Sequence, residues 1–310
     1  MDPIVSVQHL QKNFNDLKAV NDLSFTVNRG DVYGFLGENG AGKSTTIRMM
    51  LTLIKPSAGS INIFGHTLPE HRNEILRQVG AVIERPDLYK YLSAYDNLAL
   101  FARLSGVAVS RKLLMDQLDM VGLADRSASK VKTYSQGMKQ RLGIAVALVH
   151  DPKLIILDEP TNGLDPQGIA DMRNLILKLS NERNKTLIVS SHLLSEIEQI
   201  ANRMIIIHKG KKVTEGEVKV LLDPAHTIVE LQTTDDKTAA MMLHGSTWKE
   251  NILISDNIIR LEMHKTAVPL LVAWLAEQGV GILAIKPRNS LEDYFLSLTN
   301  GIRDVEPATN

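Results

Sequence analysis

Short apolar runs alternate with stretches of helical periodicity along the first two thirds of the chain. The runs begin with VSVQHL at residue 5 and end with RMIIIHKG at residue 203, and between them apolar residues recur at helical spacing. This alternation is typical of a layered α/β domain. Between about residues 88 and 131 the strand-like runs stop, and AYDNLALFARL and SRKLLMDQLDMVGL predict helices. We therefore expect an α/β domain over residues 1–218, with an inserted helical subdomain at about residues 88–150.

The pattern changes after residue 218. HTIVELQT, NIIRLEM and VGILAIKP predict strands, whereas TAVPLLVAWLAEQG and SLEDYFLSL predict helices. The first of these helices is apolar on more than one face, which favours burial in a core or a subunit interface. We expect a second, small α/β domain over residues 219–310, which ends in the polar tail DVEPATN.

Composition narrows the possible functions. The 310 residues include 35 basic and 35 acidic side chains, and this balance argues against a nucleic-acid binder with a large basic face. Cysteine is absent, which excludes disulfides and cysteine-based metal sites. The N-terminus lacks the pattern of a signal peptide, and the apolar runs are far shorter than the ~20 residues of a membrane-spanning helix. We expect no membrane-spanning segment.

The segment GENGAGKST, from Gly37 to Thr45, matches the G-x-x-x-x-G-K-[ST] phosphate-binding loop. Such a loop holds phosphate with converging backbone N–H groups, so its glycines keep side chains out of the way. A predicted strand precedes the loop and a predicted helix follows it, which disfavours a chance glycine turn. Lys43 supplies a cation and Ser44 a ligand for Mg²⁺. The predicted nucleotide-binding residues of this loop are Gly37, Asn39, Gly40, Gly42, Lys43, Ser44 and Thr45.

Acidic and imidazole groups follow two later strands. KLIILDEP ends a strand at Asp158 and Glu159, a pattern that suits one carboxylate holding Mg²⁺ and another that accepts a proton from attacking water. TLIVSSH places His192 after the next strand, where it could contact a phosphate. Taken singly, the acidic pair could cap a helix and the histidine could be structural. Their order after the phosphate-binding loop favours the catalytic interpretation.

One further motif carries a family resemblance. YSQGMKQRLGIAVAL, from Tyr134 to Leu148, resembles the signature sequence of ATP-binding cassette (ABC) ATPases, which usually reads LSGGQ or LSGGMKQR. LIILDEP is similar to their Walker B strand, NGLD ending at Asp165 to their D-loop, and His192 to their switch histidine. Phe14 matches the aromatic position that stacks on adenine, although a core aromatic is an equal alternative.

The resemblance implies an ABC nucleotide-binding domain with ATP and Mg²⁺ as its ligands. It implies that Lys43, Glu159 and His192 act in hydrolysis and that Asp158 holds the metal. In the family, the residues equivalent to Ser135 and Gly137 reach the nucleotide of the opposite subunit, so a homodimer with two equivalent sites is expected. Gln136 departs from the usual glycine of the signature.

Glu84 is a second departure, because the family usually has glutamine there. Its sequence context, IERPDLYKY, resembles exporters that protect bacteria from bacitracin and lantibiotics, as does PRNSLEDYFLSLT near the C-terminus. We predict that Glu84 approaches Mg²⁺ and has a catalytic role; the alternative is a neutral loop substitution. In the family this region, which includes Tyr89, Tyr91 and Tyr95, docks a helix of the membrane subunit.

The resemblance therefore implies an ATPase subunit on the cytoplasmic face of the cell membrane. It would power a separate polytopic permease that exports an antimicrobial peptide or other amphiphilic drug, and it would not bind nucleic acid. The alternatives are the ATPase of another transporter, or a soluble ABC ATPase that acts on DNA, ribosomes or cofactor assembly. A nucleotide sensor without hydrolysis is disfavoured because both Asp158 and Glu159 are present.

Overall fold

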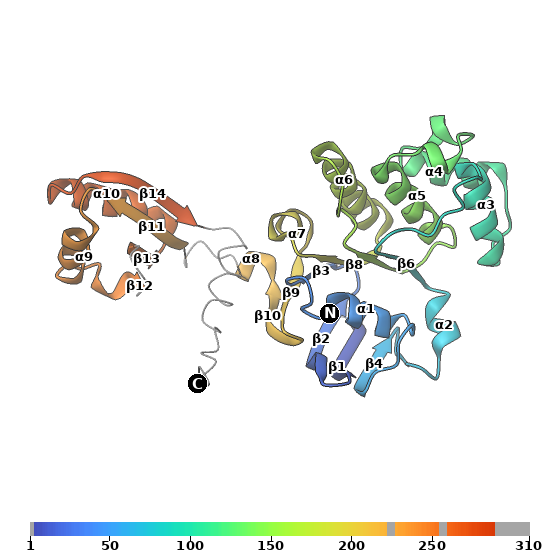
Figure 1. Ribbon diagram of the computed structural model, residues 1–310, viewed down its shortest axis with the longest axis horizontal. Helices are drawn as coiled ribbons and strands as arrows, with labels where there is room; N and C mark the ends of the chain where they lie inside the picture. The colour runs from blue at the N-terminus through green and yellow to red at the C-terminus, as the bar shows by residue number, and fades with distance from the viewer. Residues whose placement is uncertain (1–2, 222–226, 254–258, 289–310) are drawn as a thin grey trace. The chain divides into compact units, whose positions relative to one another are not determined.

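The computed structural model describes residues 3–221, 227–253 and 259–288 (Figure 1). The chain divides into two compact units, residues 1–218 and residues 219–310. The first unit contains two sheets and most of the helices. The expected layered α/β fold is confirmed.

An antiparallel sheet and a mostly parallel sheet build the first unit. The antiparallel sheet has the order β2-β1-β4-β5. Its strands are β1 (Pro3–Phe14), β2 (Leu17–Asn28), β4 (Ala58–Ile63) and β5 (His66–Thr67). The second sheet has the order β10-β9-β3-β8-β7-β6, and only the β9–β10 pair is antiparallel. Its strands are β3 (Val32–Leu36), β6 (Val79–Ile83), β7 (Leu154–Asp158), β8 (Thr186–Ser191), β9 (Arg203–His208) and β10 (Lys211–Glu217).

The main core joins the two sheets through helix α1 (Lys43–Met50). Phe25 of β2, Phe35 of β3, Ile47 of α1 and Ile61 of β4 belong to one buried cluster. Strands β3, β7 and β8 are buried along their whole length, as expected for parallel strands that are covered on both faces.

The parallel pairing brings several strand ends to one edge. Leu36 lies opposite Ser191, Asp158 lies opposite Ser190, and Ile83 lies opposite Asp158. Side chains that follow β3, β6, β7 and β8 therefore meet at the carboxyl edge of the sheet, where ligands bind in open α/β folds.

Helices α3 (Ala94–Leu104), α4 (Arg111–Met120), α5 (Gln136–Leu148) and α6 (Pro166–Arg183) gather at the other end of the first unit from the antiparallel sheet (Figure 1). Each of α3, α4 and α5 begins after a serine whose hydroxyl accepts a backbone N–H three residues on, which is an N-cap. The helices of this unit are α1, α2 (Arg72–Leu76), α3 (Ala94–Leu104), α4 (Arg111–Met120), η1 (Ala124–Arg126), η2 (Val131–Thr133), α5 (Gln136–Leu148), α6 (Pro166–Arg183) and α7 (Leu194–Ile200). Helix α8 (Val218–Leu221) begins at the boundary between the units.

In its described residues, the second unit has a four-stranded antiparallel sheet that packs with helices α9 and α10. The sheet order is β12-β13-β11-β14. Leu231 and Leu261 of the sheet are buried with Leu243 of α9 and Leu271 of α10 in one core. The elements are β11 (Thr227–Thr233), α9 (Asp236–His244), η4 (Lys249–Asn251), β12 (Ile252–Leu253), β13 (Ile259–Met263), η5 (Lys265–Ala267), α10 (Val268–Glu277) and β14 (Ile282–Arg288).

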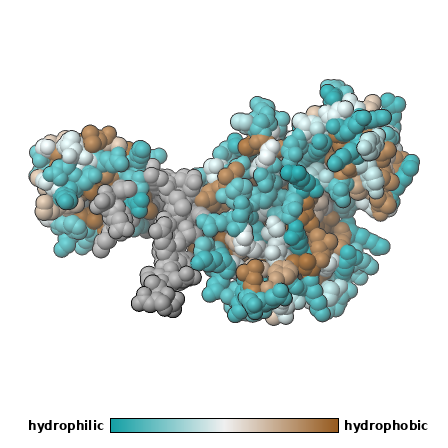
Figure 2. All heavy atoms as spheres, viewed as in Figure 1, coloured by the Kyte–Doolittle hydropathy of each residue, from teal (hydrophilic) through white to brown (hydrophobic). Residues whose placement is uncertain are grey.

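Several elements differ from the sequence expectations. Strands β5 and β10 and helices α2 and α9 were not predicted, because they are short or lack clear periodicity. The predicted helix SLEDYFLSL lies outside the described residues. None of the described helices combines the length and apolar character needed to span a bilayer. Figure 2 shows hydrophilic side chains over most of the visible surface of the first unit, with smaller hydrophobic patches between them.

Candidate functional site

The phosphate-binding loop connects β3 to α1 at the carboxyl edge of the parallel sheet. A Cβ atom on Gly37 would lie 2.4 Å from the carbonyl oxygen of Ile207, and one on Gly42 would lie 2.6 Å from that of Ala19. Gly42 also has a φ of 105°, a conformation that residues with side chains rarely adopt. Only glycine at these two positions lets the loop lie this close to β2 and β9.

The rest of the loop is open to a ligand. Asn39 and Gly40 are exposed, and Ser44 and Thr45 are half-buried in the first turn of α1. No side chain caps this helix at Gly42. The first N–H groups of a helix have no partner within the helix, so this turn suits an anion such as phosphate.

Lys43 is the buried cation of the loop, with only 5% of its surface exposed. Its Nζ donates hydrogen bonds to the carbonyl oxygens of Gly37, at 2.7 Å, and Glu38, at 3.2 Å. The same atom lies 3.2 Å from Oε1 of Glu159, an ion pair with no hydrogen bond. The lysine therefore connects the phosphate-binding loop to the end of β7.

Asp158 is the last residue of β7 and is fully buried. Its Oδ1 accepts a hydrogen bond of 2.5 Å from the Ser190 hydroxyl on β8. Its Oδ2 is buried and has no hydrogen-bond partner among the described residues. A buried carboxylate oxygen without a partner is unfavourable, and a metal ion or its water would satisfy it.

Glu159 follows Asp158 with a φ of 51°, in the left-handed region. Its backbone N–H donates to the Ser190 hydroxyl at 2.9 Å. Oε2 of its side chain lies 2.7 Å from Nδ1 of His192, which follows β8. The structure thus brings together four of the predicted residues, Lys43, Asp158, Glu159 and His192.

Glu84 follows β6 and also has a left-handed backbone, with a φ of 55°. Its Oε1 accepts a 2.5 Å hydrogen bond from Nη2 of Arg48 on α1, and both side chains are well exposed. Its carbonyl oxygen accepts a hydrogen bond from Nε2 of Gln140. Glu84 and Glu159 line the same open hollow, of about 370 Å³. The Glu84 residue lies beside the site, and its carboxylate is held by Arg48.

The residues of the signature motif and of the D-loop lie at the starts of two helices, α5 and α6. Ser135 is the exposed N-cap of α5, where its hydroxyl accepts the N–H of Met138, and Gly137 is half-buried in the first turn. Asp165 is the exposed N-cap of α6 and accepts the N–H of Gly168. Among the described residues, no hydrogen bond or ion pair connects these three to Lys43, Asp158, Glu159 or His192.

Phe14 ends β1, and 46% of its surface is exposed. The ammonium of Lys12 lies 4.8 Å from the centre of its ring. The ring is therefore not a core aromatic, and the alternative raised from the sequence does not hold.

Sequence reasoning missed several residues that support the site. Ser190 hydrogen-bonds both Asp158 and Glu159, and Arg48 holds Glu84. The pair of serines that ends TLIVSS, an otherwise apolar run, was a usable signal for Ser190. Nothing in the spacing pointed to Arg48.

A phosphate-binding loop beside two strand-end carboxylates, at the carboxyl edge of a parallel sheet, defines a P-loop nucleoside triphosphatase. The comparisons with known proteins identify the family. Residues 20–162 match the ABC transporter family. The bacitracin transport ATP-binding protein BcrA of Bacillus licheniformis is 43% identical over 304 residues, which cover 97% of this chain and 99% of that protein.

Two further similar proteins, each matching 69% of this chain, agree with this family. The lantibiotic transport ATP-binding protein SrtF of Streptococcus pyogenes is 42% identical over 214 residues, or 69% of this chain and 91% of that protein. A dimeric ATP-binding cassette in a post-hydrolysis state, bound to ADP and Pi, is similar with a TM-score of 0.63. It is 26% identical, and the match covers 69% of this chain and 98% of that one. The chain belongs to the ATP-binding proteins of ABC transporters and is an ATPase.

Proposed function

We propose that this ATPase hydrolyses MgATP at the carboxyl edge of the parallel sheet and thereby drives a separate membrane permease that exports an antimicrobial peptide. The observation that carries the proposal is the grouping of the buried Lys43 and Asp158 with the half-buried Glu159 and His192 beside the phosphate-binding loop. A buried ammonium and two carboxylates are the charges that phosphoryl transfer to water requires.

Lys43 and the loop bind the phosphates. When ATP enters, the lysine ammonium exchanges the carbonyl oxygens of Gly37 and Glu38 for phosphate oxygens. Glu159 is the general base, because its Oε1 has no hydrogen bond and can accept a proton from water. His192 bonds the other oxygen and so fixes the orientation of this carboxylate. The imidazole of His192 also lies at the strand end where it can contact the γ-phosphate.

The residues around Asp158 fit a magnesium ion. Oδ2 of Asp158 and the hydroxyl of Ser44 are oxygen donors, which Mg²⁺ prefers. An ion held by these residues would offset the negative charge that develops during transfer. Glu84 is a further candidate, but its carboxylate must first leave Arg48.

The contact to the adenine base comes from outside this group of four residues. The exposed ring of Phe14 is available to stack on adenine. Gly40 and Gly42 supply loop N–H groups, and Asn39 and Thr45 complete the loop. Together these residues form one half of the nucleotide site.

The other half comes from a second copy of the chain. Ser135, Gly137 and Asp165 lie at exposed helix starts that suit a phosphate presented by a partner. Mixing experiments test this homodimer. Lys43→Ala and Ser135→Ala proteins are each nearly inactive alone, but their mixture should regain turnover because each mixed dimer contains one intact site. A mixture as inactive as its components would contradict a shared site.

The proposed permease interface is the segment that comes after Glu84 in the sequence. The Tyr89 and Tyr91 side chains are 54% and 79% exposed, and Tyr95 is half-buried at the start of α3. Exposed aromatic side chains are well suited to bind another protein. Binding there would hold the chain at the cytoplasmic face of the membrane.

The substrate class is tested in the source organism. The chain is purified with its membrane in mild detergent, and resistance to bacitracin and to a lantibiotic is compared for wild type and Glu159→Gln. We expect a co-purifying polytopic membrane protein and loss of resistance to at least one peptide in the variant. A co-purifying ribosome or nucleic acid, or unchanged resistance to both peptides, would contradict the transport proposal.

A further inference from the structure

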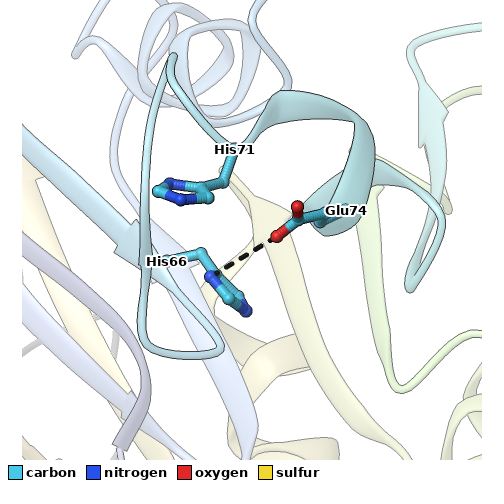
Figure 3. Close-up of side chains that lie close together, drawn as sticks. All are labelled: His66, His71 and Glu74. Carbon is cyan, nitrogen blue, oxygen red and sulfur yellow. Dashed lines mark ion pairs between the residues drawn. The ribbon is translucent and has the colours of Figure 1, made fainter.

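A compact group of metal-binding side chains lies on the segment that joins β5 to α2 (Figure 3). His66 is in β5, His71 immediately precedes α2, and Glu74 is in the first turn of that helix. One ligand atom from each lies within 4.8 Å of the others. Among the residues that the structure describes, no other three His, Asp or Glu side chains meet this criterion. We propose that this group binds a divalent transition-metal ion of the zinc type.

The distances leave room for an ion between the side chains. Nδ1 of His66 is 3.6 Å from Oε2 of Glu74, which is too long for a hydrogen bond. Tetrahedral zinc with bonds of about 2.0–2.2 Å separates its ligands by roughly 3.3–3.5 Å. The ring centres of His66 and His71 are 5.1 Å apart. Small rotations of these solvent-accessible side chains bring all three within bonding distance.

The surroundings of His71 favour a metal-binding tautomer. Its Nδ1 lies 3.4 Å from the carbonyl oxygen of Thr67. A histidine that donates one ring N–H to a carbonyl presents its other nitrogen to a metal. Arg72 is adjacent in sequence, but its guanidinium donates to the hydroxyl of Thr52 and to the side-chain oxygen of Asn73. The guanidinium of Arg72 is therefore engaged with these two side chains.

The donor set selects the class of metal. Imidazole nitrogen suits zinc, copper, nickel and iron, whereas Mg²⁺ and Ca²⁺ prefer oxygen donors alone. Two imidazoles and one carboxylate leave a fourth position for water on the exposed side. Such an ion would fasten β5 to α2, and it is chemically distinct from the Mg²⁺ proposed beside the nucleotide.

Titration of the full-length protein with Zn²⁺ tests the site. Isothermal calorimetry is performed without nucleotide and with excess Mg²⁺, on wild type, His66→Ala, His71→Ala and Glu74→Gln. Removing a group that only hydrogen-bonds a metal-ligating side chain lowers metal affinity by about 10- to 100-fold. Removing a ligating side chain itself should therefore lower Zn²⁺ affinity by at least about tenfold. His9→Ala is the matched control, because His9 is an exposed histidine that pairs with a single carboxylate, Asp22, at 2.7 Å. It should bind Zn²⁺ as wild type does.

Thermal unfolding provides a second readout that does not depend on catalysis. A ligand that binds only the folded state raises the unfolding midpoint. Zn²⁺ should raise the midpoint of wild type and His9→Ala more than that of the three site variants, all of which should turn over ATP normally. Equal zinc affinity and equal midpoint shifts in wild type, His66→Ala and His71→Ala would overturn the proposal.

Discussion

The two units bury polar groups very differently. In the described part of the first unit, the buried polar residues include Lys43, Asp158, Ser190 and Glu196. In the described part of the second unit, Thr233 is the sole buried polar residue. All buried side-chain oxygen and nitrogen atoms without a hydrogen-bond partner in the described residues belong to the first unit. These atoms are in Gln117, His150, Asp158, Glu159 and Glu196.

Sheet topology explains this difference. Parallel strands end at one edge, so the residues that follow β3, β6, β7 and β8 converge there. Antiparallel strands such as β11 and β13 end at opposite edges and do not bring consecutive chain segments together in this way. An unpaired buried carboxylate oxygen lowers stability, and its presence at the convergent edge is evidence for a ligand site. The second unit is consistent with a packed accessory domain.

The largest expected effect is on ATP hydrolysis by Lys43→Ala. The substitution removes the ammonium of the phosphate-binding loop, which lies 3.2 Å from Oε1 of Glu159. Turnover should fall by at least about 100-fold, the scale for losing one charge-stabilising donor. Steady-state phosphate release measures this effect.

Lys153→Ala is the matched control for Lys43→Ala. Lys153 immediately precedes β7, at the opposite end of the same strand from Asp158, and its ammonium donates to Gln78. This variant should retain wild-type turnover. Equal losses in the two variants would show that the carboxyl edge of the sheet has no special role.

A smaller effect is expected at Glu84. If its carboxylate approaches Mg²⁺ during turnover, Glu84→Gln should shift the Mg²⁺ concentration for half-maximal rate by about fivefold, equivalent to ~1 kcal/mol for an exposed charge. Nucleotide affinity should stay unchanged, and Glu84→Ala should reduce transport more than turnover. Arg48→Gln breaks the same ion pair without removing the carboxylate. An identical Mg²⁺ shift in both variants would mean that Glu84 acts only through Arg48.

The smallest effect is expected in the second unit, at the start of α9. Asp235 accepts hydrogen bonds from the backbone N–H and the hydroxyl of Thr238, and these bonds lower the pKa of its carboxyl. A lowered folded-state pKa contributes stability above the usual value of 3.8, and this stability is lost as the pH falls through the folded-state pKa. In Asp235→Asn, the free energy of unfolding of this unit should therefore fall slightly less than in wild type as the pH is lowered.

Hydrogen exchange of the α9 amides between pH 3 and 5, with wild type in parallel, measures the Asp235 effect. ATP turnover of Asp235→Asn should equal that of wild type. A loss of turnover would show that the second unit participates in catalysis, contrary to the comparison of the two units.

The sequence predicted the features that depend on local pattern. The apolar runs gave the long strands, and the glycine and lysine spacing gave the loop at Gly37. The two-residue strand β5 and the five-residue helix α2 were not predicted, because elements this short show no such pattern. The grouping of His66, His71 and Glu74 depends on these two elements and could not be foreseen.

Contacts between distant residues also required the structure. Ser190 lies opposite Asp158 because β7 and β8 are paired in one register, and a shift of one residue would turn its hydroxyl to the other face. The Arg48–Glu84 ion pair joins residues that are 36 positions apart. Spacing in the sequence predicted which residues end the strands, but not which partners hold them.

Single-turnover hydrolysis by Glu159→Gln tests the central claim most directly. The amide preserves the shape of the side chain but cannot accept the proton of water, so the rate should fall by about 10²- to 10⁴-fold while ATP affinity is retained. Glu182→Gln, an exposed carboxylate change on α6, is the control and should behave as wild type. With ATP bound, Glu159→Gln should accumulate as a dimer. Wild-type hydrolysis by folded Glu159→Gln would contradict the assignment of the general base.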